Sequence, residues 1–275
     1  MPVMPGAEPF HHDGGSVGVL LCHGFTGTPQ SLRPWAEHLA AAGLTVALPR
    51  LPGHGTTLAE ANLTHWEDWY AELDRHFTQL RERCDQVFVM GLSMGGTLAI
   101  RLAEVHGDDV AGLVLVNPSL LTKRPDRFLL PVLRRVTPTW PGIASDIKKP
   151  GMVELAYDKI PLKASYQLTR LWLTTRGDLA KVTQPVLIFR STEDHVVDEK
   201  TQPIITSGIS SRDVTIRCPD RSGSRCPDRQ LLLEQPVGRG FTSRVAADSY
   251  RSRSTRESLQ CQCSMGRRQC RRWWN

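Results

Sequence analysis

The chain has 275 residues, a length that fits one large domain or one domain with an appendage and leaves ample room for a hydrophobic core. Its net charge of +6 would indicate nucleic-acid binding if the charge were evenly spread. From residue 212 onward, however, fourteen Arg stand against six Asp or Glu, which is +8, so the first 211 residues carry −2. The basic character belongs to the tail, and we expect no nucleic-acid partner.

The first residues carry no sign of targeting or of a membrane segment. Residues 1–15 have neither a basic start nor an apolar centre, and the longest apolar run, 17–22, is far shorter than a membrane span. Two cysteines, Cys22 and Cys84, precede the tail; both adjoin apolar runs, where a buried and inert thiol is expected. We therefore expect a cytoplasmic protein without stable membrane insertion.

Strands and helices alternate through the first half of the chain. Thr28 and Pro29 are typical of a helix start and Gly43 of a helix stop, and the spacing of Trp66, Trp69, Leu73, Phe77 and Leu80 predicts a second helix over 66–83. Nearly continuous apolar runs predict buried strands at 17–22, 44–48, 87–90 and 110–116. Alternating helices and apolar strands indicate an α/β fold with a parallel sheet covered on both faces.

Residues 91–95 read Gly-Leu-Ser-Met-Gly, a G-x-S-x-G motif between a predicted strand and a predicted helix. That context predicts a sharp strand-to-helix turn that presents Ser93 at the carboxyl edge of the sheet, with glycines where side chains would clash. The N–H of Met94, at the positive end of the helix, would point toward a developing oxyanion. The motif alone is also compatible with an ordinary Gly/Ser turn, but the flanking strand and helix favour the nucleophile.

The alternation stops between residues 118 and 182. Six prolines separate short amphipathic pieces there, which predicts a helical insertion that forms a lid over a pocket. The apolar run 185–190 resumes the sheet, and the polar turn 193–197 ends it where a carboxylate could reach toward Ser93.

Three further segments add to this motif: 5–10, the loop His23-Gly24-Phe25-Thr26-Gly27, and 154–157. Together with the turn 193–197, they make the chain similar to the α/β-hydrolase superfamily, and within it to the bacterial monoacylglycerol lipase and carboxylesterase branch. The resemblance covers about residues 5–211. It implies a serine hydrolase that cleaves monoacylglycerols or short- to medium-chain carboxyl esters through an acyl-serine, with no cofactor and no metal.

The resemblance also assigns roles to single residues. It implies Ser93 as the nucleophile, Asp194 as the triad acid, and the backbone N–H groups of Phe25 and Met94 as the oxyanion hole. Two lid residues, Ile143 and Glu154, would line the pocket for the glycerol head. A serine nucleophile, rather than an aspartate, argues against the related dehalogenases and epoxide hydrolases.

The catalytic histidine that the resemblance implies is not found. It should follow the acid by about thirty residues, after a last strand that 214–216 could begin, and an ungapped count puts Ser224 in its place. No histidine follows His195, which we interpret as part of the acid turn. An inactive or impaired hydrolase-fold protein, which binds ligands in a lidded pocket, is therefore the alternative.

The earlier histidines are expected to have other roles. His23 and His54 belong to the loops that carry the resemblance, where structural roles are expected. Solvated positions on surface helices or the N-terminal arm are expected for the remaining six, which are His11, His12, His38, His65, His76 and His106.

The tail at 217–275 departs from the rest of the chain. It contains no Lys or His, repeats Arg-Cys-Pro-Asp-Arg at 217–221 and 225–229, and shows no helical period, which predicts an irregular or disordered segment. One hypothesis is a reading-frame shift or a foreign fusion near residue 217, which leaves 1–216 as the hydrolase core. The alternatives are zinc binding, although the cysteine spacing matches no zinc pattern, and an arginine-rich interaction segment.

Overall fold

The computed structural model describes residues 2–122, 128–141, 155–191 and 197–218. All of these residues belong to one compact unit. The sequence predictions for Ile143, Glu154, Asp194, His195 and the tail from residue 219 lie outside the described residues.

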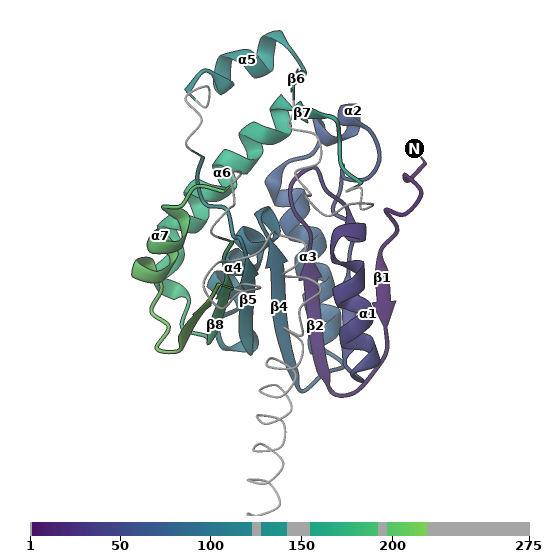
Figure 1. Ribbon diagram of the computed structural model, residues 1–275, viewed down its shortest axis with the longest axis vertical. Helices are drawn as coiled ribbons and strands as arrows, with labels where there is room; N and C mark the ends of the chain where they lie inside the picture. The colour runs from purple at the N-terminus through teal and green to yellow at the C-terminus, as the bar shows by residue number, and fades with distance from the viewer. Residues whose placement is uncertain (1, 123–127, 142–154, 192–196, 219–275) are drawn as a thin grey trace, which may run out of the picture. The chain divides into compact units, whose positions relative to one another are not determined.

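A mostly parallel sheet forms the centre of the described structure (Figure 1). Its strand order is β1-β3-β2-β4-β5-β8-β9, and every neighbouring pair is parallel except β1 with β3. The strands are β1 (Phe10–His12), β2 (Val17–Cys22), β3 (Thr45–Leu48), β4 (Gln86–Leu92), β5 (Gly112–Val116), β8 (Val186–Phe189) and β9 (Val214–Arg217). The predicted parallel sheet is confirmed. The sequence missed β1 because this short edge strand is largely exposed and has no apolar run.

The helices follow from right-handed crossovers between these strands. Across the sheet, the step from β2 to β3 runs in the opposite direction to the steps from β3 to β4 and from β4 to β5. The helix between β2 and β3 therefore lies on one face of the sheet, and the long helices that precede and follow β4 lie on the other face. The helices and 3₁₀ turns up to β5 are η1 (Pro29–Leu32), α1 (Arg33–Ala41), α2 (Leu58–Ala61), α3 (Trp66–Arg81), α4 (Met94–His106) and η2 (Gly107–Asp109). The helix predicted to begin at Pro29 starts as the 3₁₀ turn η1, and the side chain of Thr28 makes no capping bond.

An insertion between β5 and β8 rises above the carboxyl edge of the sheet (Figure 1). Its described elements, followed by the helix before β9, are α5 (Leu130–Val136), β6 (Thr139–Pro141), β7 (Lys159–Pro161), α6 (Leu162–Asp178), η4 (Leu179–Lys181) and α7 (Thr201–Gly208). The prediction of short pieces was wrong for α6, which runs for 17 residues because Pro161 lies at its N-cap rather than inside it.

One side chain outside the insertion bonds both to the residue before β6 and to the residues after β7. Asn62, just after α2, donates from Nδ2 to the carbonyl of Pro138 at 2.8 Å. Its Oδ1 accepts the backbone N–H groups of Lys163 at 2.9 Å and Ala164 at 3.4 Å. These three bonds fix the entry to β6 and the first turn of α6 to the same point on the core.

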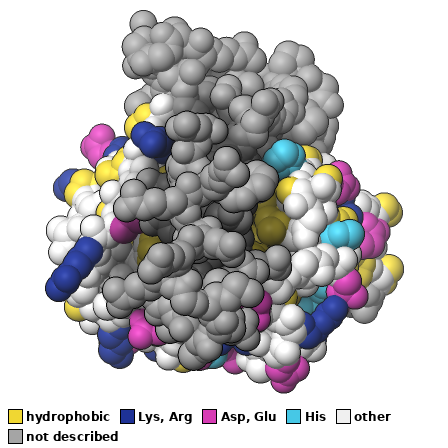
Figure 2. All heavy atoms as spheres, turned by 90° about the horizontal axis from the view of Figure 1, so that it is seen from below, with side chains coloured by type: hydrophobic (Ala, Val, Ile, Leu, Met, Phe, Trp, Pro, Cys, Tyr) yellow, Lys and Arg dark blue, Asp and Glu magenta, His cyan; other side chains and the backbone are white. Residues whose placement is uncertain are grey.

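The described surface is mixed in character. The part of the insertion around α5 exposes apolar side chains, with Phe128 73%, Val132 60% and Val136 79% accessible. On the face seen in Figure 2, the Lys and Arg side chains of the described residues lie among Asp and Glu side chains. Each helix in the described ranges falls short of the length or apolar character needed to cross a membrane.

The core on the α3 and α4 side of the sheet is apolar and contains both early cysteines. Cys22 and Cys84 are buried and form no disulfide, and burial strongly raises the pKa of the Cys22 thiol. The predicted burial of both thiols is therefore confirmed. Trp69, Phe77 and Met94 are among the largest side chains that this core encloses.

A carboxyl group is buried where α4 meets α6. The side chain of Glu104 is 0% accessible, and Arg101 Nη1 bridges it at 2.9 Å to Asp178, which lies 2.6 Å away on the other side. Oε1 of Glu104 has no hydrogen-bond partner. Burial raises the pKa of Glu104 to about 8, because the pairing with Arg101 only partly offsets the loss of water.

We expect the stability of the protein to decline from mildly acidic to mildly alkaline pH because of Glu104. With a pKa of about 8 when folded against an ordinary value of 4.5, the folded state holds a proton between these values that the unfolded state releases. Its stabilising contribution is complete below the lower value and is lost as pH rises toward the upper one. Glu104→Gln should therefore weaken the pH dependence of the unfolding free energy.

The measurement is urea unfolding at several pH values between 5 and 8. Glu37→Gln, which changes an exposed glutamate on α1, is the matched control. A difference between Glu104→Gln and the unmodified chain that stays constant across this range would contradict the expectation.

Candidate active site

Ser93 occupies the predicted turn between β4 and α4, in a backbone conformation that is unfavourable for a residue with a side chain. Its φ is 55° and its ψ is −114°. A Cβ on Gly91 would lie 2.2 Å from the carbonyl of Gly95, and one on Gly95 would lie 2.0 Å from the carbonyl of Cys22. Glycine is thus required on both sides of Ser93, as the motif predicts.

The backbone of Ser93 is anchored to the neighbouring strand. Its N–H donates to the carbonyl of Val116 at 2.9 Å, and its carbonyl accepts from Gly96 at 3.0 Å and from Ser119 at 3.2 Å. Val116 ends β5, so the turn is held against the carboxyl edge of the sheet. These bonds explain how the strained conformation is maintained.

The two loops expected to form the oxyanion hole emerge from adjacent strands. Cys22, the last residue of β2, is in register with Gly91 on β4. The loop that follows Cys22 therefore begins beside the turn at Ser93, and its first carbonyls lie against Gly95. Met94 is the first residue of α4, where a backbone N–H has no acceptor within the helix.

Phe25 belongs to that first loop, and the residue after it is conformationally special. Thr26 has a φ of 61°, and its hydroxyl donates to the carbonyl of Phe25 at 2.6 Å. The Phe25 ring packs near Trp69, with centroids 6.0 Å apart. The loop is thus fixed by its own hydroxyl bond and by an aromatic contact to α3.

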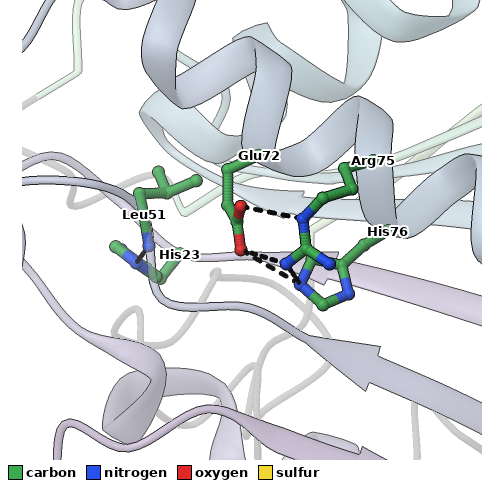
Figure 3. A network of polar contacts seen from close by, with 5 residues as sticks. All are labelled: His23, Leu51, Glu72, Arg75 and His76. Carbon is green, nitrogen blue, oxygen red and sulfur yellow. Dashed lines mark hydrogen bonds and ion pairs between the residues drawn. The ribbon is translucent and has the colours of Figure 1, made fainter.

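His23 links this loop to the loop that follows β3 (Figure 3). Its Nε2 accepts the backbone N–H of Leu51 at 3.2 Å, and its Nδ1 lies 3.0 Å from the carbonyl of Gly24. Because the ring is completely buried, its pKa falls to about 3 and it stays neutral. Both nitrogens are engaged with backbone, which confirms the predicted structural role.

His54, in the loop after β3, is also buried. Its Nδ1 lies 3.0 Å from the carbonyl of Pro52, and its ring packs edge-on against Phe25 with centroids 6.1 Å apart. Burial lowers its pKa to about 4. This ring fills the space behind Phe25, in agreement with the predicted structural role.

The prediction of a solvated position was wrong for His76. Its ring is 7% accessible, stacks on His11 at 5.0 Å and contacts Glu72 on the preceding turn of α3 at 3.1 Å (Figure 3). His11 belongs to the strand β1 and lies against His76 of α3, and the sequence pattern missed that strand. Burial lowers the pKa of both His11 and His76.

Asn117 is a site residue that the sequence reasoning did not single out. It follows β5, has a φ of 41°, and its Oδ1 accepts the N–H of Ser191 at 2.8 Å. Its own N–H donates to the carbonyl of Phe189, also at 2.8 Å. Asn117 therefore fixes the chain at Phe189 and at Ser191, which precedes Asp194 by three residues in the sequence. A short polar residue directly after a buried apolar run was the available signal.

The structure does not describe the other residues expected at the site. Asp194, Ile143 and Glu154 lie outside the described ranges. The first described residue after Glu154 is Leu155, whose N–H donates to Oε1 of Gln30 at 3.0 Å. Within the described ranges, no three His, Cys, Asp or Glu side chains gather in a way that could hold a metal ion.

Comparison with known proteins identifies the family of this site. Residues 17–222 match the family model described as serine aminopeptidase, S33. The chain belongs to this family of α/β hydrolases. The α/β-hydrolase fold predicted from the sequence is thereby confirmed, and the relatives described next confirm the predicted branch.

Individual relatives of this α/β hydrolase agree with the family model. The chain is 46% identical over 244 residues to a thermostable monoacylglycerol lipase of Bacillus sp. (strain H-257), covering 86% of this chain and 95% of the relative. It is 25% identical over 219 residues to a carboxylesterase of Bacillus subtilis (strain 168), covering 78% of this chain and 87% of the relative.

A solved structure also resembles this α/β hydrolase over most of its length. It comes from a study of the metagenome-derived lipolytic enzymes LipS and LipT, with 40% identity and a TM-score of 0.79. The match covers 86% of this chain and 98% of that chain.

The positive φ of Ser93 leads to a stability prediction. Such a conformation costs a residue with a Cβ about 1–3 kcal/mol, whereas glycine adopts it freely and loses about 0.4–1 kcal/mol through the entropy of the unfolded chain. Ser93→Gly should therefore be more stable than Ser93→Ala by about 1 kcal/mol. Urea unfolding of the two variants measures this difference.

Ser165, in the first turns of α6, offers the matched pair of substitutions. There Ser165→Gly should be less stable than Ser165→Ala by about 1 kcal/mol, because glycine is unfavourable in a helix. If the Gly variant were less stable than the Ala variant at Ser93 as well as at Ser165, strain at Ser93 would not contribute to stability.

Proposed function

We propose that this α/β hydrolase cleaves carboxylic esters, and monoacylglycerols in particular, through an acyl-enzyme at Ser93. The observation that carries the proposal is the strained turn, which places Ser93 ahead of the N-terminus of α4 and beside the loop of Phe25. The names of the relatives support the substrate class, since one is a monoacylglycerol lipase and another a carboxylesterase.

In the proposed reaction, Oγ of Ser93 attacks the ester carbonyl and displaces the alcohol. The negative charge that develops on the carbonyl oxygen would be met by the N–H groups of Phe25 and Met94. Donors placed in advance stabilise the transition state more than the ground state, and removing one such donor typically costs about 3–4 kcal/mol of barrier. Water then hydrolyses the acyl-serine and releases the fatty acid.

The proposed pocket residues account for specificity. Glu154 would accept hydrogen bonds from the glycerol hydroxyls, and Ile143 would contact the apolar part of the substrate. Asp194 would be the acid of the triad, the member that in a complete triad orients and stabilises the cationic base.

Removal of the serine proton is the step for which the sequence supplies no histidine in the expected place, because none follows His195. His23 is already engaged through both ring nitrogens. We therefore expect turnover well below that of a complete triad, since the members of a triad act as a unit. This deficit is the reason to keep ligand binding without turnover as the alternative, although the lipase and carboxylesterase relatives favour hydrolysis.

Added imidazole separates the two candidates. Hydrolysis of p-nitrophenyl butyrate and of a monoacylglycerol is measured with and without imidazole, beside Ser93→Ala under the same conditions. We expect Ser93-dependent turnover that imidazole increases at least severalfold, because the free base takes over the missing proton transfer.

The acyl-enzyme provides a second measurement. Mass spectrometry after brief exposure to the p-nitrophenyl ester should show one added acyl group on the chain and none on Ser93→Ala. Equal rates for the two proteins in both conditions, with no acyl adduct, would contradict ester hydrolysis and leave the binding function.

A further inference from the structure

Tyr157 belongs to the insertion and lies two residues after Leu155, yet its hydroxyl contacts the loop of the core that follows β3. The hydroxyl donates to the carbonyl of Gly53 at 2.8 Å and accepts the N–H of Thr56 at 3.1 Å. The side chain is 8% accessible. The loop after β3 is thus held at Gly53 and at Thr56 by one buried phenol from a segment about a hundred residues away in sequence.

The loop that Tyr157 holds has an unusual backbone. Gly53 and Gly55 have φ values of 71° and 65°. A Cβ at Gly55 would lie 2.6 Å from that of Ala7, so the chain is also closely packed here. Such a loop needs external hydrogen bonds to stay in one conformation, and the phenol of Tyr157 supplies two of them.

The backbone of Tyr157 contacts a second loop. Its N–H donates to the carbonyl of Thr26 at 3.4 Å, and the nearby N–H of Leu155 donates to Gln30. Thr26 is the residue with positive φ directly after Phe25. The segment 155–157 therefore holds the loop of Phe25 as well as the loop after β3.

The two loops also contact each other. Leu51 donates to His23, and the ring of His54 packs on the rings of both His23 and Phe25, with centroids 5.3 Å and 6.1 Å away. His54 lies between Gly53 and Thr56, the two partners of the Tyr157 hydroxyl. A shift of this part of the loop would move the ring that supports Phe25.

We propose that Tyr157 is a positioning residue for the oxyanion donor at Phe25. The hydroxyl of Tyr157 fixes the segment around His54, and the His54 ring supports the Phe25 ring. The backbone N–H of Tyr157 holds the carbonyl of Thr26, the residue after Phe25. An oxyanion donor is effective only when its orientation is set before the reaction, so this arrangement affects the transition state more than substrate binding. The inference rests on the proposed ester hydrolysis.

The test removes only the hydroxyl. Tyr157→Phe is compared with Tyr70→Phe, which removes a phenol 3.5 Å from Asp74 within α3. Turnover is measured with p-nitrophenyl butyrate in the presence of imidazole. We expect kcat of Tyr157→Phe to fall about tenfold while KM changes less than twofold, because a displaced donor weakens binding of the transition state alone. Tyr70→Phe should leave both constants unchanged.

Amide hydrogen exchange gives a readout that needs no turnover. In Tyr157→Phe, exchange should accelerate in residues 51–57 and also in 23–27, and Tyr70→Phe should change neither segment. If the chain shows no Ser93-dependent turnover, the proposed function fails and exchange alone decides the present inference. Acceleration confined to 51–57, an increase in KM with kcat preserved, or equal effects of the two variants would overturn it.

Discussion

The close contact between Gly95 and the end of β2 is the constraint on which the catalytic region depends. The first turn of α4 reaches the carbonyls of Cys22 and His23 because Gly95 has no side chain. This contact brings the N-terminus of α4 beside the loop of Phe25, and it forces the chain to turn sharply at Ser93. The proposed nucleophile and the proposed oxyanion donors therefore owe their proximity to the same absence of a Cβ.

Buried neutral histidines complete this arrangement. An apolar side chain in place of His23 could fill the same space, but it could not accept the N–H of Leu51. Burial keeps His23 and His54 uncharged, so they serve as rigid rings with hydrogen-bonding atoms at their edges. The loops after β2 and β3 thereby act as one unit, to which Tyr157 of the insertion adds a third element.

The sequence predicted the parts of the fold whose signal is local. Continuous apolar runs marked β2, β4 and β5, and the glycines of the motif marked the turn at Ser93, because each depends on residues adjacent in the chain. It missed β1, whose pairing with β3 is set by tertiary contact, and with it the burial of His76. It also missed Asn117 and Tyr157, since their roles arise from hydrogen bonds to distant segments.

Asn62 bonds to the insertion through main-chain atoms, namely the carbonyl of Pro138 and the N–H groups of Lys163 and Ala164. Main-chain groups are the same whatever side chains the insertion carries. The side chains of the insertion can therefore vary in evolution while the junction with the core is unchanged. In a laboratory exchange of insertions between relatives, the junctions are best placed at these three residues, with Asn62 retained as their hydrogen-bonding partner.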